Sequence, residues 1–141
     1  MKKAIRAVIV ILVACICALS CKKIINTVAI TGEWELIRTT VYVDGVMTED
    51  IPSTQVRTFY NFESDGVFTI TKTLAVAGAA ADIQSGRWRV DGNQLIMIFL
   101  DDTKIYDIDK ANLFRLELSE TTMVAGKKMV TKLTLTNDIV G

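Results

Sequence analysis

Residues 85–95 read Ser-Gly-Arg-Trp-Arg-Val-Asp-Gly-Asn-Gln-Leu, which is the pattern of a β-hairpin. The pair Asp91-Gly92 suits a two-residue primed turn, whose backbone twist matches that of two antiparallel strands. Side chains alternate between the two faces of a strand. The turn therefore predicts Trp88 opposite Leu95 on an inner face, with the two arginines beside the tryptophan on the outer face.

A second hairpin is predicted around the Ser-Asp-Gly sequence at residues 64–66, which suits a type I turn with its glycine in a left-handed bulge position. That turn places Phe62 opposite Phe68. One step further from the turn, it places Tyr60 opposite Ile70. The two hairpins together put six side chains on the inner face, where they either line an apolar cavity or fill the interior: Tyr60, Phe62, Phe68, Ile70, Met97 and Phe99.

β-Branched and aromatic residues with a period of two recur along the chain and predict strands. A single proline and the absence of a helix-period segment after residue 20 also favour an all-β fold. In the last two strands we expect Phe114, Leu116, Leu118, Leu133 and Leu135 on the inside. The eight predicted strands are Glu33–Val43, Gln55–Glu63, Val67–Leu74, Ile83–Val90, Gln94–Leu100, Lys104–Asp107, Leu113–Leu118 and Met129–Thr136.

The predicted links between these strands differ in length. The long ones are residues 44–54, 75–82 and 119–128, whereas most others are tight. Alternate links of a meander lie at the same end. One end is therefore closed by the tight links, and the other carries the long loops. We therefore predict an up-and-down antiparallel barrel of about eight strands with one open mouth, a shape that can hold one small ligand. Residues 75–81 are small and apolar, and form either a lip of this mouth or a plain connector.

The first 20 residues have the pattern of a signal peptide. A basic start is followed by an apolar run from Ala7 to Ser20, which at 14 residues is shorter than the roughly 20 that a membrane-spanning helix needs. Ala18-Leu19-Ser20 then precedes Cys21, as in a bacterial lipoprotein signal, although an ordinary secretory signal and a spanning anchor are alternatives. We expect a signal peptide at 1–20, a lipid-anchored tether at 21–30 and a barrel domain at 31–141.

Two cysteines compete as the site of lipid attachment. Leu12-Val13-Ala14 before Cys15 matches the lipoprotein pattern more closely in letters, but cleavage there leaves an apolar stub on the mature protein. Cleavage before Cys21 gives a normal leader length and a polar start, so Cys21 is preferred. The three cysteines all lie at the leader, and residues 22–141 therefore have no disulfide, thiolate nucleophile or cysteine metal site.

Composition excludes several classes of function. Removing the three basic residues of the leader leaves 13 basic against 16 acidic residues, a formal charge of −3, and this gives no footprint for nucleic acid. Histidine is absent, so histidine ligands and general bases are excluded. The aspartates at 101, 102, 107 and 109 lack the spacing of a calcium loop. No catalytic set, metal site or cofactor site is recognisable, and we expect a protein that is not an enzyme.

Three blocks of sequence carry a family resemblance. Gly32-Glu33-Trp34 at the first strand resembles the Gly-x-Trp signature of lipocalins. Residues 62–68 and 85–95 are similar to two later blocks of lipocalin-like domains in bacterial lipoproteins, and the resemblance spans residues 31–137. It implies that Gly32, Trp34, Trp88 and Gly92 are structural motif residues. It also implies that Trp34 plugs the closed end, often against an arginine of the final strand, where this chain offers Lys132 instead.

The resemblance and the leader together imply a cellular location and a function. A lipoprotein of this type carries three acyl chains on its cysteine, as a diacylglycerol and a palmitate. It lies in the cell envelope, at the outer membrane of a Gram-negative bacterium. The barrel is then expected to bind a small apolar or amphipathic ligand. The alternative is a non-enzymatic protein-binding or structural module that uses the loops or the outer face of the strand at 94–100.

The strand at 94–100 is apolar on both faces, because Ile96, Ile98 and Leu100 alternate with its inward residues. An exposed apolar face indicates a partner, a second copy or a membrane. The chain's own segment Ile24–Ile30 could cover it instead, and this self-coverage is the preferred interpretation.

Overall fold

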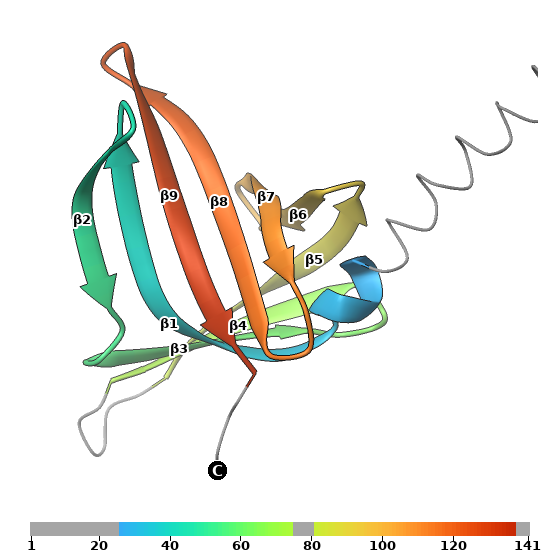
Figure 1. Ribbon diagram of the computed structural model, residues 1–141. Coiled ribbons are helices and arrows are strands. Elements are labelled where there is room, and N and C mark those ends of the chain that lie inside the picture. The colour runs from blue at the N-terminus through green and yellow to red at the C-terminus, as the bar shows by residue number, and fades with distance from the viewer. Residues whose placement is uncertain (1–25, 75–80, 138–141) are drawn as a thin grey trace, which may run out of the picture.

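The computed structural model describes residues 26–74 and 81–137, which fold into an antiparallel β-barrel (Figure 1). Apart from β2, which pairs with β1 at the edge, its strands follow one another around the sheet in chain order, and β1 also bonds to β9, which closes the ring. The strands are β1 (Gly32–Val43), β2 (Val46–Pro52), β3 (Val56–Phe62), β4 (Val67–Leu74), β5 (Asp82–Asp91), β6 (Gln94–Ile98), β7 (Thr103–Ala111), β8 (Arg115–Val124) and β9 (Lys127–Thr136). The predicted all-β meander barrel is confirmed, with eight strands in the ring and β2 outside it.

The β3–β4 hairpin has the predicted register. Phe62 lies opposite Phe68 and Tyr60 opposite Ile70, and Gly66 has a φ of 90°. Only glycine adopts this left-handed conformation without a steric cost, so the turn sequence sets the register of both strands.

The β5–β6 hairpin differs from the prediction by one residue on each strand. Asp91 pairs with Gln94, so the two turn residues are Gly92 and Asn93 rather than Asp91 and Gly92. Trp88 therefore lies opposite Met97 and not opposite Leu95, which pairs with Val90. Because the shift is one residue on both strands, every side chain keeps its predicted face.

Two predicted long links are extended hairpins. The segment 44–54 contains β2, and the segment 119–128 is the paired continuation of β8 and β9. Both turns have two central residues with positive φ, Asp44-Gly45 and Ala125-Gly126, as a primed turn requires. The carboxylate of Asp44 accepts a hydrogen bond from the backbone N–H of Lys128 at 3.0 Å, which joins the two hairpin tips. The third long link lies at 75–80, outside the described residues.

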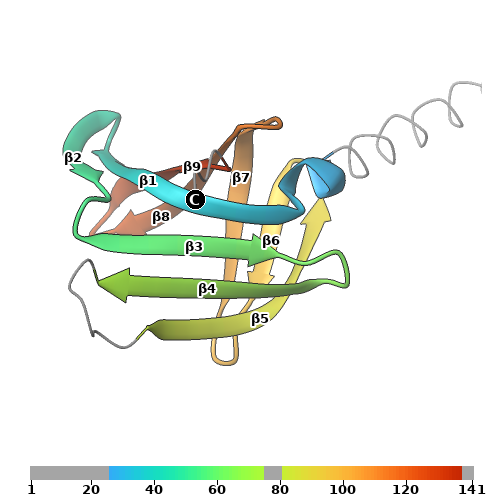
Figure 2. The ribbon, with the colours of Figure 1, turned by 90° about the horizontal axis from the view of Figure 1, so that it is seen from below.

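A short helix at residues 26–30 packs against one end of the barrel, where the sequence predicts only a tether (Figure 2). The side-chain amide of Asn26 donates to the carbonyl of Gly92 at 2.9 Å. Ile30 is fully buried in the core, and its carbonyl accepts a hydrogen bond from Trp34 Nε1 at 2.8 Å. We call this the closed end; it also carries the β3–β4, β5–β6 and β7–β8 links. No helix among residues 26–74 and 81–137 is long and apolar enough to span a membrane.

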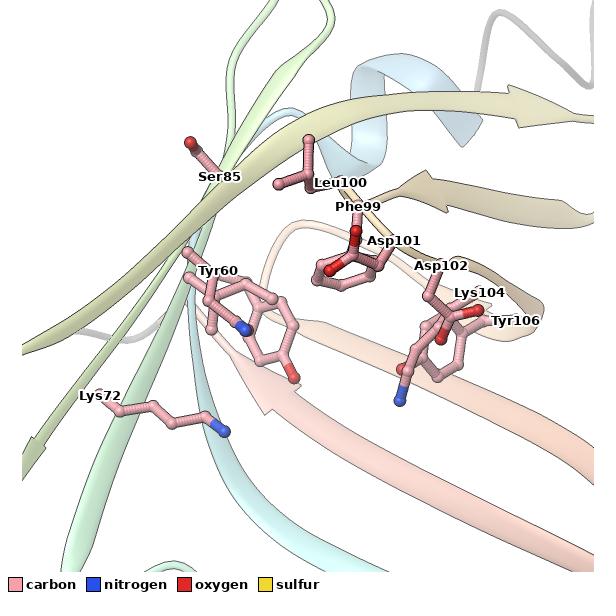
Figure 3. A pocket seen from close by; sticks show the side chains of 11 residues that line it. Tyr60, Lys72, Ser85, Phe99, Leu100, Asp101, Asp102, Lys104 and Tyr106 are labelled. Carbon is pink, nitrogen blue, oxygen red and sulfur yellow. The ribbon is translucent and has the colours of Figure 1, made fainter.

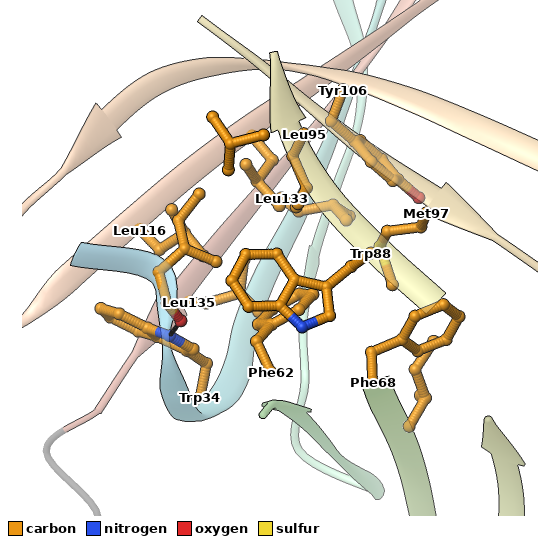
Figure 4. Packing of buried hydrophobic residues seen from close by; sticks show 14 residues of the cluster. Trp34, Phe62, Phe68, Trp88, Leu95, Met97, Tyr106, Leu116, Leu133 and Leu135 are labelled. Atoms are coloured by element: carbon orange, nitrogen blue, oxygen red, sulfur yellow. Dashed lines mark hydrogen bonds between the residues drawn. The ribbon is translucent and has the colours of Figure 1, made fainter. Parts of the chain in front are cut away.

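The hydrophobic core fills the half of the barrel nearest the closed end (Figure 4). Phe62 meets Trp88 edge-on with ring centroids 5.3 Å apart. Trp34, Phe62, Phe68, Leu95 and Met97 are almost completely buried. The prediction that Phe114 points inward is wrong, because this residue is exposed in the link before β8, where the strand has not yet begun.

Candidate ligand-binding cavity

A cavity of 460 Å³ lies at the open end of the barrel, opposite the short helix. Its walls come from β3, β4, β5 and β7, together with the β6–β7 link at residues 99–102. On β3, β4 and β7 the lining includes the inward residue that follows the last core residue toward the open end, namely Tyr60, Lys72 and Lys104. The cavity is therefore the unfilled half of the barrel interior, and the packed aromatic half forms its floor.

The apolar part of the wall consists of Tyr60, Ile70 and Phe99, together with the exposed Leu100 at its rim. The Phe99 ring meets the Phe68 ring edge-on, with centroids 4.9 Å apart. Tyr60 stacks on Phe62 with centroids 6.2 Å apart. Since Phe62 and Phe68 are fully buried, these contacts hold the wall residues against a rigid floor.

Two tyrosine hydroxyls face the cavity from neighbouring parts of its wall (Figure 3). Neither the Tyr60 nor the Tyr106 hydroxyl hydrogen-bonds to another residue in the described part of the chain. Burial raises the pKa of the Tyr60 phenol. Burial, and then the nearby Tyr60, Glu120 and Asp102, raises the pKa of Tyr106. Both phenols therefore keep their protons at neutral pH and can donate a hydrogen bond to a guest.

Charged side chains surround the entrance of the cavity. Lys104 Nζ lies 4.0 Å from the Glu120 carboxylate, whereas Lys72 has no ion-pair partner among the described residues. Asp101 and Asp102 belong to the β6–β7 link. Figure 3 shows the Lys72 side chain extended along the wall. The entrance is thus polar and of mixed charge, and one of its cations is not neutralised.

The six side chains predicted on the inner face separate into two groups. Tyr60, Ile70 and Phe99 line the cavity. Phe62, Phe68 and Met97 are fully buried in the core beneath it and fill the interior of the closed half. Three of the six side chains therefore border the open half of the interior, and three fill the closed half.

Sequence reasoning missed the polar wall of the cavity. Tyr106, Lys72 and Lys104 were not predicted to line it, because the prediction rested on the apolar inward residues of the two hairpins. The alternation of inward and outward residues on β4 does predict Lys72 on the inner face, because it follows Phe68 and Ile70 at a spacing of two. An inward lysine marks the point where a strand leaves the dry interior.

The four motif residues lie at the closed end and on β5. Trp34 Nε1 and Trp88 Nε1 each donate to a backbone carbonyl, of Ile30 and Glu63 respectively, at 2.8 and 2.9 Å. Gly32 and Gly92 have positive φ values of 129° and 60°. Lys132 does not lie against Trp34; its Nζ is 5.0 Å from the centre of the Tyr42 ring.

The outer face of β6 is only partly covered. Ile96 is buried, Ile98 is partly exposed, and Leu100, in the link beyond the strand, is almost completely exposed. Of the segment predicted to cover it, Ile30 joins the interior core and residues 24 and 25 lie outside the described residues, so the cover stays a prediction. Ile24 lies outside the described residues, as do Cys15 and Cys21.

No group of three or more aspartate, glutamate, cysteine or histidine side chains that could hold a metal ion occurs in the described residues. The cavity lining offers hydrogen bonds, the ammonium of Lys72, the carboxylates of Asp101 and Asp102, and apolar contact. This is the chemistry of a binding site.

Comparison with known proteins identifies the fold as lipocalin-like. The family model described as a lipocalin-like domain matches residues 30–125. Lobster apocrustacyanin A1 has a TM-score of 0.54 at 14% identity, over 86% of this chain and 67% of that one. A lipocalin-like protein from Bacteroides uniformis ATCC 8492 has a TM-score of 0.49 at 19% identity, over 74% of this chain and 97% of that one. A sequence search of curated proteins found no match.

Proposed function

The chain belongs to the family of lipocalin-like domains, which bind small hydrophobic ligands, and we propose that its open half binds one small amphipathic molecule. The single observation that carries the proposal is the pair of hydroxyls of Tyr60 and Tyr106, which face a 460 Å³ cavity without a protein partner. Both hydroxyl oxygens are accessible from the cavity, so each can hydrogen-bond to water or to a polar group of a guest.

The lining defines the chemistry of the guest. The volume falls within the range of roughly 300–1,000 Å³ that is typical of small-molecule sites. Phe99 and Ile70 offer an apolar surface, and the two phenols are donors to an acceptor group on the guest. At the entrance, Lys72 can pair with an anionic group on the end of the guest that remains near water, whereas Asp101 and Asp102 can pair with a cationic one.

We also propose that the protein is a lipoprotein of the cell envelope, anchored through Cys21 with Cys15 as the alternative. The support is the leader pattern, with its basic start, short apolar run and small residues before the cysteine. Three acyl chains would make such an anchor firm, since two lipid signals already suffice for stable attachment. Mass spectrometry of the mature protein purified from membranes tests this, because acylated Cys21 is then the first residue.

A fluorescent probe tests the binding site. 1-Anilinonaphthalene-8-sulfonate is apolar at one end and anionic at the other, and we expect it to bind with a single saturable site. The double variant Tyr60→Phe and Tyr106→Phe keeps both rings and removes both hydroxyls. Each lost hydrogen bond is worth about 1 kcal/mol, so the dissociation constant should rise roughly tenfold or more.

The chain offers a matched control for this experiment. Its third tyrosine, Tyr42, lies on β1 under Lys132 and away from the cavity. Tyr42→Phe should leave probe affinity unchanged. Equal affinity in the double variant and in the control would overturn the assignment of the cavity as the site.

A further inference from the structure

The closed end carries an apolar surface that nothing in the described chain covers. Val28 on the short helix is 70% exposed, and Leu113 and Phe114 in the β7–β8 link are 76% and 68% exposed. Val28 and Leu113 border the same hollow, which has a volume of 560 Å³ and also reaches Trp34. The helix and the link lie side by side in Figures 1 and 2. We call Val28, Leu113 and Phe114 the apolar tip.

The β7–β8 link holds its two apolar side chains outward by hydrogen bonds to its backbone. The side-chain oxygen of Asn112 accepts from the N–H groups of Phe114 and Arg115, both at 2.9 Å. The backbone N–H of Asn112 donates to the carbonyl of Arg115 at 3.0 Å. Exposure of Leu113 and Phe114 is therefore built into the structure of the link.

The end of β9 fixes the same link from its other side. The hydroxyl of Thr136 donates to the carbonyl of Phe114 at 3.2 Å, and the side-chain amide of Asn137 donates to the carbonyl of Leu113. The link is thus preorganised, and little conformational entropy is lost when the tip enters an apolar environment.

The length of the chain before the described residues argues for a lipid surface as that environment. The described chain begins with Asn26, on the same short helix as Val28 of the apolar tip. Five peptide steps separate Asn26 from Cys21, and an extended chain of that length spans at most about 18 Å. An acylated Cys21 would therefore hold the closed end within that distance of the bilayer. Lys22 and Lys23 lie on the connecting segment, where they favour anionic headgroups.

We propose that the apolar tip inserts into the bilayer interface, so that the barrel stands on its closed end and its mouth points away from the membrane. This orientation rests on the proposed lipid anchor at Cys21. It makes the ligand enter from the aqueous side. Carboxylates of Glu63 and Asp65 in the β3–β4 link oppose an anionic surface, so insertion should depend on apolar contact and persist at high salt.

Depth-dependent quenching tests this orientation in the complete acylated protein. Because acylation occupies Cys21, an introduced cysteine is the only free thiol of the mature chain. An environment-sensitive fluorophore on Leu113→Cys should be quenched several-fold more strongly by acyl-chain spin-labelled lipids than one on Met123→Cys. The vesicles contain phosphatidylethanolamine and phosphatidylglycerol. Met123 is a matched control, since it is 67% exposed near the far hairpin tip.

Equal quenching at the two positions would overturn the proposed orientation. A second variant guards against an effect of the label: Leu113→Ser with Phe114→Ser should keep its unfolding temperature but lose quenching of a fluorophore on Val28→Cys. Unchanged quenching there would also overturn it. If mass spectrometry shows Cys21 without acyl chains, the anchor and the orientation fail together, whereas strong acylation with an unquenched Leu113→Cys overturns the orientation alone. Ligand binding in the cavity is independent of either result.

Discussion

The closed and open halves of the barrel are built from the same strands but are filled differently. On β4 the inward residues run from Phe68 through Ile70 to Lys72, from buried to exposed. On β7 the inward residues run from the buried Tyr106 to the half-buried Lys104 in the same direction, toward the open end. The closed half is sealed by the short helix, whereas the open half ends in a polar entrance.

This gradient along each strand explains where a guest can bind. A charged side chain on an inward position is too costly to bury without a partner, so it requires a solvated space. Large aromatic side chains at the other end fill the interior at the density of a normal core. The two halves therefore have different roles: the closed half stabilises the fold, and the open half provides a cavity.

The largest difference between the halves should appear when an inward aromatic residue is removed. Phe62→Ala in the closed half should lower the free energy of unfolding by about 3–5 kcal/mol, because it leaves a cavity in a packed core. Phe99→Ala at the open cavity should cost less than half as much, since its neighbours already border empty space. Denaturant unfolding measures both. Equal losses would contradict a division into a packed and an open half.

A smaller effect is expected at the seal of the closed end. Trp34→Phe keeps most of the ring but removes the Nε1 donor, which leaves the carbonyl of Ile30 without this partner. An unsatisfied buried group costs about 1–3 kcal/mol, so thermal unfolding should occur at a lower temperature. Hydrogen exchange at residues 26–31 should also accelerate. Unchanged exchange there would show that this bond does not hold the helix.

Much of the fold follows from local signals in the sequence. The turn at residues 64–66 contains the glycine that its backbone requires, and the register of β3 and β4 follows from it. β2 was missed because every one of its residues is exposed, so it lacks the alternation that burial imposes on a strand. In residues 91–94, two overlapping pairs could form the turn, and only cross-strand pairing decides between them.

The candidate site was predicted only in part, and the reason is physical. Tyr60, Ile70 and Phe99 were found because they are apolar and inward. Tyr106 and Lys72 were not, since their roles depend on where the packed core ends. That boundary is set by the helix at 26–30 and by the sizes of the aromatic side chains, which are tertiary effects.

The tyrosines of the open half should respond to alkaline pH. Burial raises the pKa of Tyr60 and of Tyr106 in the folded protein. Their contribution to stability is complete below the unfolded value of about 10 and is lost as the pH rises toward the folded value. The free energy of unfolding should therefore fall above about pH 10. In the Tyr106→Phe variant the free energy of unfolding should fall less steeply with pH. A slope identical to that of the unmodified protein would contradict the assigned burial.

The smallest change is expected at a hairpin tip beyond the open half. Ala125 has a φ of 51°, a conformation that is unfavourable for alanine. Ala125→Gly should stabilise the protein by about 0.5 kcal/mol. Gly126→Ala, at a φ of 78°, is the opposite control and should destabilise it. Chemical unfolding measures the pair, and neither variant should alter probe binding in the cavity.

The most direct test of the division between the halves is native mass spectrometry of the protein purified gently from its source cells. We predict one additional small molecule per chain, which is released on denaturation and is lost or strongly reduced in the Tyr60→Phe and Tyr106→Phe double variant. A protein that carries no small molecule under any gentle condition, or one whose adduct persists unchanged in the double variant, would contradict the account.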